Sequence, residues 1–370
     1  MMFEAGDRDF YSIAVFAGDG IGPEVMTPAK ALVARACEKA DAPAPQFEDL
    51  PGGAGTYQTL GSALPAASID AARTADAIFL SAMGDPTVRY PDGTEITPQI
   101  DLRMEFGLFA GVRPVRTFPG MPVPLKDPRA QSLDIVLIRE STEGLFSPDA
   151  PGRVSEDEAR ETMLITRSVT RKLSNFGFEV ARARAAKRSG TGQPGRLTCI
   201  DKANVFPAFA FMRSVFDECA KQYPDVTADH MYIDAAALNL VKRPWDFDVA
   251  ITENMFGDIL SDLGAALMGG LGFAPSADIG DGHAVFQPCH GSAPDIAGRG
   301  LANPTAMILS GVMMLEWLSV RFECPQTADA AHLLQAAVEE AYAGGTLIPT
   351  EAGGNHGTQD VADAIARALG

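Results

Sequence analysis

The chain has 370 residues, 46% of them hydrophobic and 21% charged, which indicates a folded globular protein rather than a disordered one. Its 30 basic and 48 acidic residues give a net charge of −18, which disfavours binding to nucleic acid or anionic membranes. The five cysteines form no CxxC pair, so neither a zinc site nor a disulfide framework is expected, and their odd number suits a reducing cytoplasm. The start MMFEAGDRDFYS lacks the features of a signal peptide, and no apolar run approaches the roughly 20 residues that span a bilayer.

Apolar strands alternate with helices along the chain. YSIAVFAG (11–18) predicts a strand followed by a helix from about Pro23, and ADAIFLSAM and SLDIVLIRE predict two more strands. The polar stretch 147–159 predicts a surface excursion or an oligomerisation arm, and a long helix is expected over about 155–176. Strands are also predicted in GRLTCIDKAN, ADHMYIDAA and FDVAITEN, the last leading into the helix MFGDILSDLGAALMG. This order predicts an α/β protein with strands buried on both faces.

A glycine loop, GDGIGPE (18–24), lies between the first strand and the first helix. Its G-x-G-x-G spacing differs from the dinucleotide-binding fingerprint, and no acidic residue follows at the expected distance. A tight strand-to-helix turn explains the glycines at least as well as a phosphate-binding role does.

Two carboxylates lie four residues apart in a predicted helix. Asp258 and Asp262 therefore share one face, where their like charges repel. A solvated acidic face is the ordinary explanation of that spacing, but Met255, Ile259, Leu260 and Leu263 predict a largely buried helix. A divalent cation such as Mg²⁺ or Mn²⁺ would compensate the pair, and Asp234, at the end of a strand, could supply a third oxygen.

Basic residues stand near the ends of predicted strands. Arg103 and Arg113 flank the apolar segment FGLFAGV, and Arg139 ends a strand, so the three guanidinium groups suit carboxylate binding, although each alone could form a surface ion pair. Lys202 follows the strand LTCI, where a lysine either takes part in proton transfer or extends its amine into solvent.

Six motifs in order give the chain a family resemblance: GDGIGPEV, LRMEFGLFAGVRP, IRESTEGLF, DKANV, ENMFGDILSDL and HGSAPDIAGRGLANPTAMIL. Together they resemble the isocitrate/isopropylmalate dehydrogenases, which are metal-dependent β-decarboxylating enzymes. The resemblance implies an α/β fold of two subdomains that is not a Rossmann fold, with the active site in the cleft between them. The terminal, cofactor-side subdomain would comprise 1–108 and 269–370, and the central subdomain, with a dimerisation arm, 109–268.

The resemblance also implies roles for individual residues. Arg103, Arg113 and Arg139 would bind the carboxylates of a malate-like substrate, and Asp258 and Asp262 would bind the metal. Asp234, as a further metal ligand, and Lys202, as a catalytic residue, would come from the partner subunit of a homodimer or higher oligomer. The metal would polarise the substrate while hydride passes to the nicotinamide ring.

HGSAPDIAG resembles the family's adenosine loop. Asp295 favours NAD, because a carboxylate accepts hydrogen bonds from ribose hydroxyls and repels the 2′-phosphate of NADP. In the NADP-using relatives that this loop resembles, Lys and Tyr stand at the positions of Asp295 and Ile296. The expected cofactor contacts are His290, Gly291, Ser292, Ala293, Asp295, Ile296, Asn303 and Asn204.

One departure from the family pattern concerns proton transfer. Phe146 stands where the family has a tyrosine whose hydroxyl protonates the product carbon after CO2 leaves, and phenylalanine has no such proton. Three explanations stay open: another group replaces the tyrosine, the enzyme oxidises its substrate without needing that step, or the chain is a weakened or repurposed paralogue.

A second departure concerns the substrate's variable group. Thr97 and Gln99 precede Arg103 where isopropylmalate enzymes have leucines, which favours a polar substituent, as in isocitrate, homoisocitrate, tartrate or malate. Met104 stands where a basic residue is usual. Gln287, in FQPCHG, replaces a common glutamate, with no evident consequence.

Three alternatives remain from the sequence. The chain could act on 3-isopropylmalate, it could be a non-catalytic regulatory subunit, for which only Phe146 speaks, or it could bind metal and anions without redox chemistry.

Overall fold

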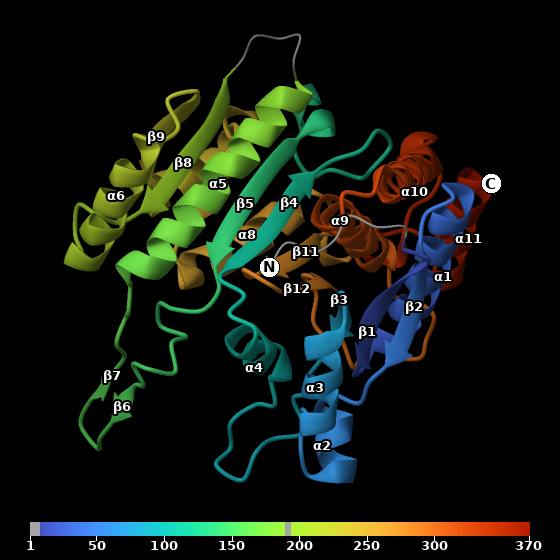
Figure 1. Ribbon diagram of the computed structural model, residues 1–370, viewed down its shortest axis with the longest axis horizontal. Coiled ribbons are helices and arrows are strands. Elements are labelled where there is room, and N and C mark those ends of the chain that lie inside the picture. The colour runs from blue at the N-terminus through green and yellow to red at the C-terminus, as the bar shows by residue number, and fades with distance from the viewer. Residues whose placement is uncertain (1–7, 189–193) are drawn as a thin grey trace.

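The computed structural model describes residues 8–188 and 194–370, and its largest element is a ten-stranded sheet (Figure 1). Residues 1–7 of the segment examined for a signal peptide lie outside the described residues. In spatial order the strands are β2 (Ala44–Asp49), β1 (Phe10–Gly18), β3 (Ala77–Ala82), β12 (Ala284–Pro288), β11 (Pro275–Ile279), β4 (Ala110–Arg116), β5 (Asp134–Glu140), β10 (Val249–Thr252), β8 (Gly195–Asp201) and β9 (Val226–Tyr232).

Strand direction divides the sheet into two parallel ends joined by an antiparallel centre. On one side β2, β1, β3 and β12 are parallel neighbours, and on the other β5, β10, β8 and β9 are. Strand β11 runs antiparallel to β12 and β4, and β4 runs antiparallel to β5. This mixed order confirms the α/β fold and differs from the doubly wound nucleotide-binding sheet.

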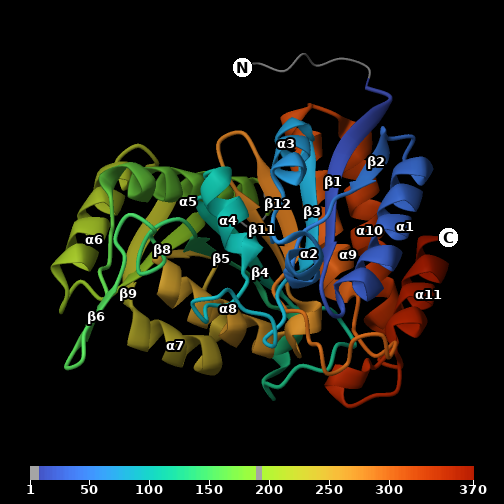
Figure 2. The same ribbon diagram turned by 90° about the horizontal axis from the view of Figure 1, so that it is seen from below.

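Helices cover both ends of the sheet (Figures 1 and 2). Helices from the chain termini pack together beside β1, β2 and β3, whereas α5 and α6 pack on β8 and α8 packs on β5. The helices are α1 (Gly22–Lys39), α2 (Ala54–Leu60), α3 (Ala66–Thr74), α4 (Pro98–Glu105), α5 (Arg167–Lys187), α6 (Pro207–Ala220), α7 (Ile233–Lys242), α8 (Asn254–Leu267), α9 (Thr305–Arg321), α10 (Pro325–Ala343) and α11 (Thr358–Leu369).

Buried apolar side chains fill the layers between sheet and helices. The largest cluster joins residues of α1, α9 and α10 to strands at the centre of the sheet, and a second lies under α5 and α6. The first cluster includes residues from both of the expected subdomains, such as Leu137 and Leu315. The division of the chain into 1–108 with 269–370 and 109–268 stays a prediction.

The helix expected over 155–176 is wrong at its start. Residues 153–160 instead form an exposed hairpin of β6 (Arg153–Val154) and β7 (Ala159–Arg160), which extends away from the sheet (Figure 1). Helix α5 begins after Thr166, whose hydroxyl accepts a hydrogen bond from the Val169 amide, and it continues to Lys187. The N-cap decides this boundary, because it satisfies an amide that has no partner within the helix.

No helix among residues 8–188 and 194–370 has both the length and the apolar character required to cross a membrane. The five cysteines are free thiols, and three of them, Cys37, Cys199 and Cys219, are buried.

Candidate active site

Three arginines meet where the antiparallel centre of the sheet faces α8. Arg103 comes from α4, Arg113 from β4 and Arg139 from β5, and all three line one pocket of about 150 Å³. Burial, with the charge of Arg103 next, lowers the pKa of Arg139 to about 10. Guanidinium groups so close together favour an anion in the pocket, as expected for binding a carboxylate substrate.

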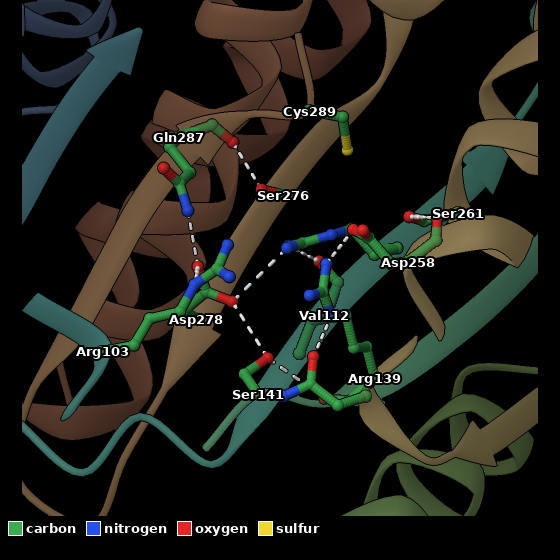
Figure 3. Close-up of polar contacts among 12 residues, drawn as sticks. Arg103, Val112, Arg139, Ser141, Asp258, Ser261, Ser276, Asp278, Gln287 and Cys289 are labelled. Carbon is green, nitrogen blue, oxygen red and sulfur yellow. Dashed lines mark hydrogen bonds and ion pairs between the residues drawn. The ribbon is translucent and has the colours of Figure 1, made fainter. Parts of the chain in front are cut away.

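The two candidate metal ligands reach the same pocket from α8. The Asp258 carboxylate contacts the Arg139 guanidinium (Figure 3). Asp262 lies one turn further along the helix and lines the same pocket. The pKa of Asp262 is raised, first by burial and then by the charge of Asp258. Two carboxylates that repel each other in this way fit a divalent cation, because the ion would relieve their repulsion.

The expected burial of α8 is confirmed for one face of the helix but not for the face that carries the carboxylate pair. Ile259 is 60% exposed and the Asp258 side chain is 52% exposed, although Leu260 is fully buried. One face of α8 packs on β5, and Asp258 and Asp262 lie among the exposed residues of the helix. The carboxylate pair is therefore not deeply buried, and the neighbouring charges are what favour a cation.

Lys202 and Asp234 do not join this pocket within one chain. Their side chains form an ion pair with each other at the ends of β8 and β9, and neither lines the pocket. The Lys202 ammonium lowers the pKa of Asp234 by hydrogen bonding. Asn204 is exposed in the turn after β8 and is likewise absent from the pocket lining.

Asp278, on β11, is a site residue that the sequence reasoning missed. Its carboxylate is completely buried and accepts hydrogen bonds from Arg103 Nε at 3.1 Å, Arg113 at 3.4 Å and Gln287 Nε2 at 2.5 Å (Figure 3). Burial raises the pKa of Asp278, but Arg103 and then Arg113 and Arg139 outweigh it and hold the pKa below its usual value. A lone acidic residue inside the apolar strand PSADI was the available signal, because such a charge requires a buried partner.

The glycine loop packs directly against the predicted adenosine loop. The Ile21 amide donates a hydrogen bond to the Ser292 carbonyl at 2.8 Å, and Gly20 has a positive φ of 58°. A Cβ on Gly20 would lie 1.9 Å from the Ser292 oxygen. The side chain of Asp19 accepts hydrogen bonds from the amides of Ala54, Gly55 and Gly84. The glycine loop is therefore a tight turn that packs against the predicted adenosine loop and helps to hold it in place.

The predicted cofactor contacts lie in different settings. His290 and Gly291 line the pocket beside the arginines, and burial lowers the pKa of His290, which favours its neutral form. Asp295 is exposed. Asn303 is buried, and both polar atoms of its side chain are engaged: Nδ2 with Glu351 Oε1, and Oδ1 with Thr305 at the start of α9. Its side chain thus anchors α9, which the sequence did not reveal.

Another group of potential metal ligands lies away from the pocket. Cys199, Asp201 and His230 are close enough to share an ion. However, Arg213 binds both oxygens of Asp201, at 2.8 and 2.7 Å, and His230 pairs with Asp217. These ion pairs account for the cluster without a metal.

A sequence model described as isocitrate/isopropylmalate dehydrogenase matches residues 12–365. The chain belongs to this family. It is 38% identical to the 3-isopropylmalate dehydrogenase of Aquifex aeolicus, over 96% of both chains, and 37% identical to the 3-isopropylmalate/3-methylmalate dehydrogenase of Methanocaldococcus jannaschii, over 96% and 98%.

Solved structures support the same family. The isocitrate dehydrogenase of Methylococcus capsulatus superposes with a TM-score of 0.83 at 31% identity, covering 97% of this chain and 99% of that one. A β-decarboxylating dehydrogenase of Thermococcus kodakarensis gives 0.77 at 35% identity, covering 97% and 96%. The family is one of oxidoreductases, so this chain is of the decarboxylating dehydrogenase kind.

Phe146, which replaces the family tyrosine, lies beside the pocket. The Arg139 guanidinium carbon is 5.3 Å from the centre of the Phe146 ring, and the residue is 37% exposed. A hydroxyl on this ring would thus be carried next to a residue that lines the pocket.

We expect Phe146→Tyr to raise the rate of CO2 release by about tenfold or more, because it supplies a proton donor and a positioned general acid typically contributes about 10²–10⁴-fold to the rate. Parallel assays of NADH absorbance and released CO2 measure the two rates. Phe10→Tyr, a change at another exposed ring, is the control. An unchanged rate of CO2 release in Phe146→Tyr would mean that another group already supplies the proton.

Proposed function

We propose that this chain is an NAD-dependent and Mg²⁺- or Mn²⁺-dependent dehydrogenase of (2R)-malate-type 2-hydroxy acids with a polar substituent, acting with decarboxylation. The observation that carries the proposal is the pocket that holds Arg103, Arg113 and Arg139 opposite Asp258 and Asp262. Guanidinium groups bind the carboxylates of such an acid, and paired carboxylates bind a divalent ion.

The residues of the pocket have separate tasks in this reaction. Asp258 and Asp262 would hold the metal, which when bound polarises the substrate hydroxyl and the developing carbonyl. The arginines fix the carboxylates, so that C2 loses a hydride to nicotinamide and its hydroxyl loses a proton. Breaking the C3–carboxylate bond then releases CO2 and leaves an electron pair on C3, where a proton must be added. The Phe146 side chain has no acidic proton, so another group must donate the proton to C3.

Exposed apolar side chains support a homodimer or higher oligomer with shared active sites. Helices α7 and α8 contact each other (Figure 2). On these helices Leu238, Val241 and Ile259 are 54%, 47% and 60% exposed. A second copy would cover this face and bring its Lys202 and Asp234 to the pocket of the first, Asp234 as a metal ligand and Lys202 as a proton-transfer residue. The exposed hairpin of β6 and β7 would serve as the dimerisation arm.

The loop with His290, Gly291, Ser292, Ala293, Asp295 and Ile296 supports NAD as the cofactor. Asp295 is exposed and Ile296 half-buried, so both are accessible to a nucleotide. We expect Asp295→Lys with Ile296→Tyr to raise kcat/KM for NADP relative to NAD by about tenfold or more, because lysine attracts the 2′-phosphate that aspartate repels.

Initial rates with each cofactor measure this ratio. Asp363→Lys, the same charge change at an exposed position on α11, controls for general attraction of the nucleotide. A cofactor ratio that moves equally in both variants would contradict the assignment of Asp295.

The nature of the substituent separates two candidate substrates. The names of the relatives favour 3-isopropylmalate. Gln99, which lines the pocket, and Thr97, at the start of α4, favour a polar group instead, because an isopropyl group would leave the Gln99 amide without a partner. We propose the polar class on this ground, with 3-isopropylmalate as the second candidate.

A panel of malate-type acids with NAD and Mn²⁺, in which NADH and CO2 are measured separately, tests the proposal. We expect metal-dependent NADH formation from the purified chain alone, with isocitrate, homoisocitrate, tartrate or malate ahead of 3-isopropylmalate. A preference for 3-isopropylmalate over all four would contradict the polar pocket. No NADH with any acid would leave a regulatory subunit, and failure to bind NAD would leave a metal- and anion-binding protein.

A further inference from the structure

Asp278 and Gln287 form a hydrogen-bonded pair beside the pocket, in which Gln287 belongs to the pocket lining and Asp278 lies behind it. They lie on neighbouring antiparallel strands, where Ser276 pairs with Gln287, so Asp278 and Gln287 share one face of the sheet. The Gln287 amide donates to Asp278 Oδ2 at 2.5 Å, and both residues are buried. The glutamate common at position 287 in the family would place a second carboxylate against Asp278. The amide instead donates a hydrogen bond, which accounts for the glutamine.

The buried carboxylate changes the charge that a substrate meets. Asp278 accepts hydrogen bonds from Arg103 Nε and from Arg113, while Arg139 donates to Asn254 at 2.9 Å and contacts Asp258. One of the three positive charges is thus neutralised by a residue that cannot leave. The pocket therefore offers one unit of positive charge less to the carboxylates of a ligand than three unpaired arginines would.

Three buried polar atoms of pocket-lining residues have no hydrogen-bond partner among residues 8–188 and 194–370: Ser81 Oγ, Gln99 Oε1 and His290 Nε2. An unpartnered buried polar atom is unfavourable, so this set indicates a ligand with polar groups. Gln99 Oε1 can only accept a hydrogen bond. A hydroxyl on the substrate can donate one, whereas an ionised carboxylate and an isopropyl group cannot.

We propose that Asp278, held by Gln287, sets the substrate class of this site: a four-carbon dicarboxylic acid with hydroxyl groups on C2 and C3. This inference rests on the proposed function and names its substrate. A tricarboxylic acid would bring a third negative charge to a pocket that Asp278 has already partly neutralised. An isopropyl group on C3 would leave Gln99 Oε1 without a hydrogen-bond donor.

The test compares kcat/KM for four acids with NAD and Mn²⁺: the tartrate stereoisomers, (2R)-malate, isocitrate and 3-isopropylmalate. We expect a tartrate to exceed isocitrate and 3-isopropylmalate by about tenfold or more, because a site built to hydrogen-bond a hydroxyl rejects analogues that lack it. NADH with a different order of preference would overturn this inference alone. No NADH with any acid would overturn the proposed function and this inference with it.

Variants identify the residue that is responsible. Asp278→Asn removes the buried charge and should move the tartrate-to-isocitrate ratio at least about tenfold toward isocitrate. Asp278→Asn combined with Gln287→Glu returns a carboxylate to the same cluster and should move the ratio back. An unchanged ratio in a folded Asp278→Asn would assign Asp278 a structural role only. If that variant does not fold, Gln99→Leu decides: it should lower tartrate use and raise 3-isopropylmalate use, and the opposite change would overturn the proposal.

Discussion

An equal mixture of two inactive variants, Asp262→Asn and Lys202→Met, will regain roughly a quarter of wild-type activity once subunits exchange. Asp262 lines the pocket, whereas Lys202 lies outside it in the same chain. In a dimer with shared sites, half of the randomly formed pairs are mixed, and one site of each mixed pair is intact, which gives about one intact site in four. Each variant alone should lose about 10²-fold or more. NADH formation before and after mixing measures the recovery.

The matched control mixes Asp258→Asn with Asp262→Asn. Both residues belong to the same face of α8, so no exchange can produce an intact site, and activity should stay at the level of the single variants. Recovery in this control, or none in the first mixture despite proven subunit exchange, would contradict shared active sites. Full activity of Lys202→Met alone would remove the lysine from the reaction.

Gly20→Ala will raise the KM for NAD by about tenfold or more and destabilise the fold by about 1–3 kcal/mol. The positive φ of Gly20 strains any residue with a side chain, and the new Cβ would lie 1.9 Å from the Ser292 carbonyl oxygen. Relief of this contact must move the loop that carries His290 and Asp295. Titration of NAD in initial-rate assays and thermal unfolding measure the two effects.

Gly282→Ala is the control for this substitution. Its Cβ would meet no atom within 4 Å and its φ is not positive, so both the KM and the unfolding temperature should stay near wild type. If Gly20→Ala unfolds earlier but keeps its KM for NAD, the glycine loop stabilises the fold without positioning the cofactor loop.

Motifs close together in the sequence were predictable because their geometry is local. Asp258 and Asp262 lie one helical turn apart in any α-helix, and Arg139 ends a strand whose apolar pattern is evident, so both were placed correctly. The start of α5 was misplaced because a single hydrogen bond from Val169 to Thr166 decides it, and the periodicity of the following residues does not mark that position.

By itself, the sequence determined the family and the α/β class, and it predicted the arginines and the aspartate pair that the structure brings to one pocket. Only the tertiary structure decided which charged groups that are distant in the sequence form ion pairs. Asp278 is 175 residues from Arg103 and 165 from Arg113, and only the antiparallel centre of the sheet brings the three together. Electrostatic and hydrogen-bond energies depend on separation in space, so the role of Gln287 became visible only beside the carboxylate it contacts.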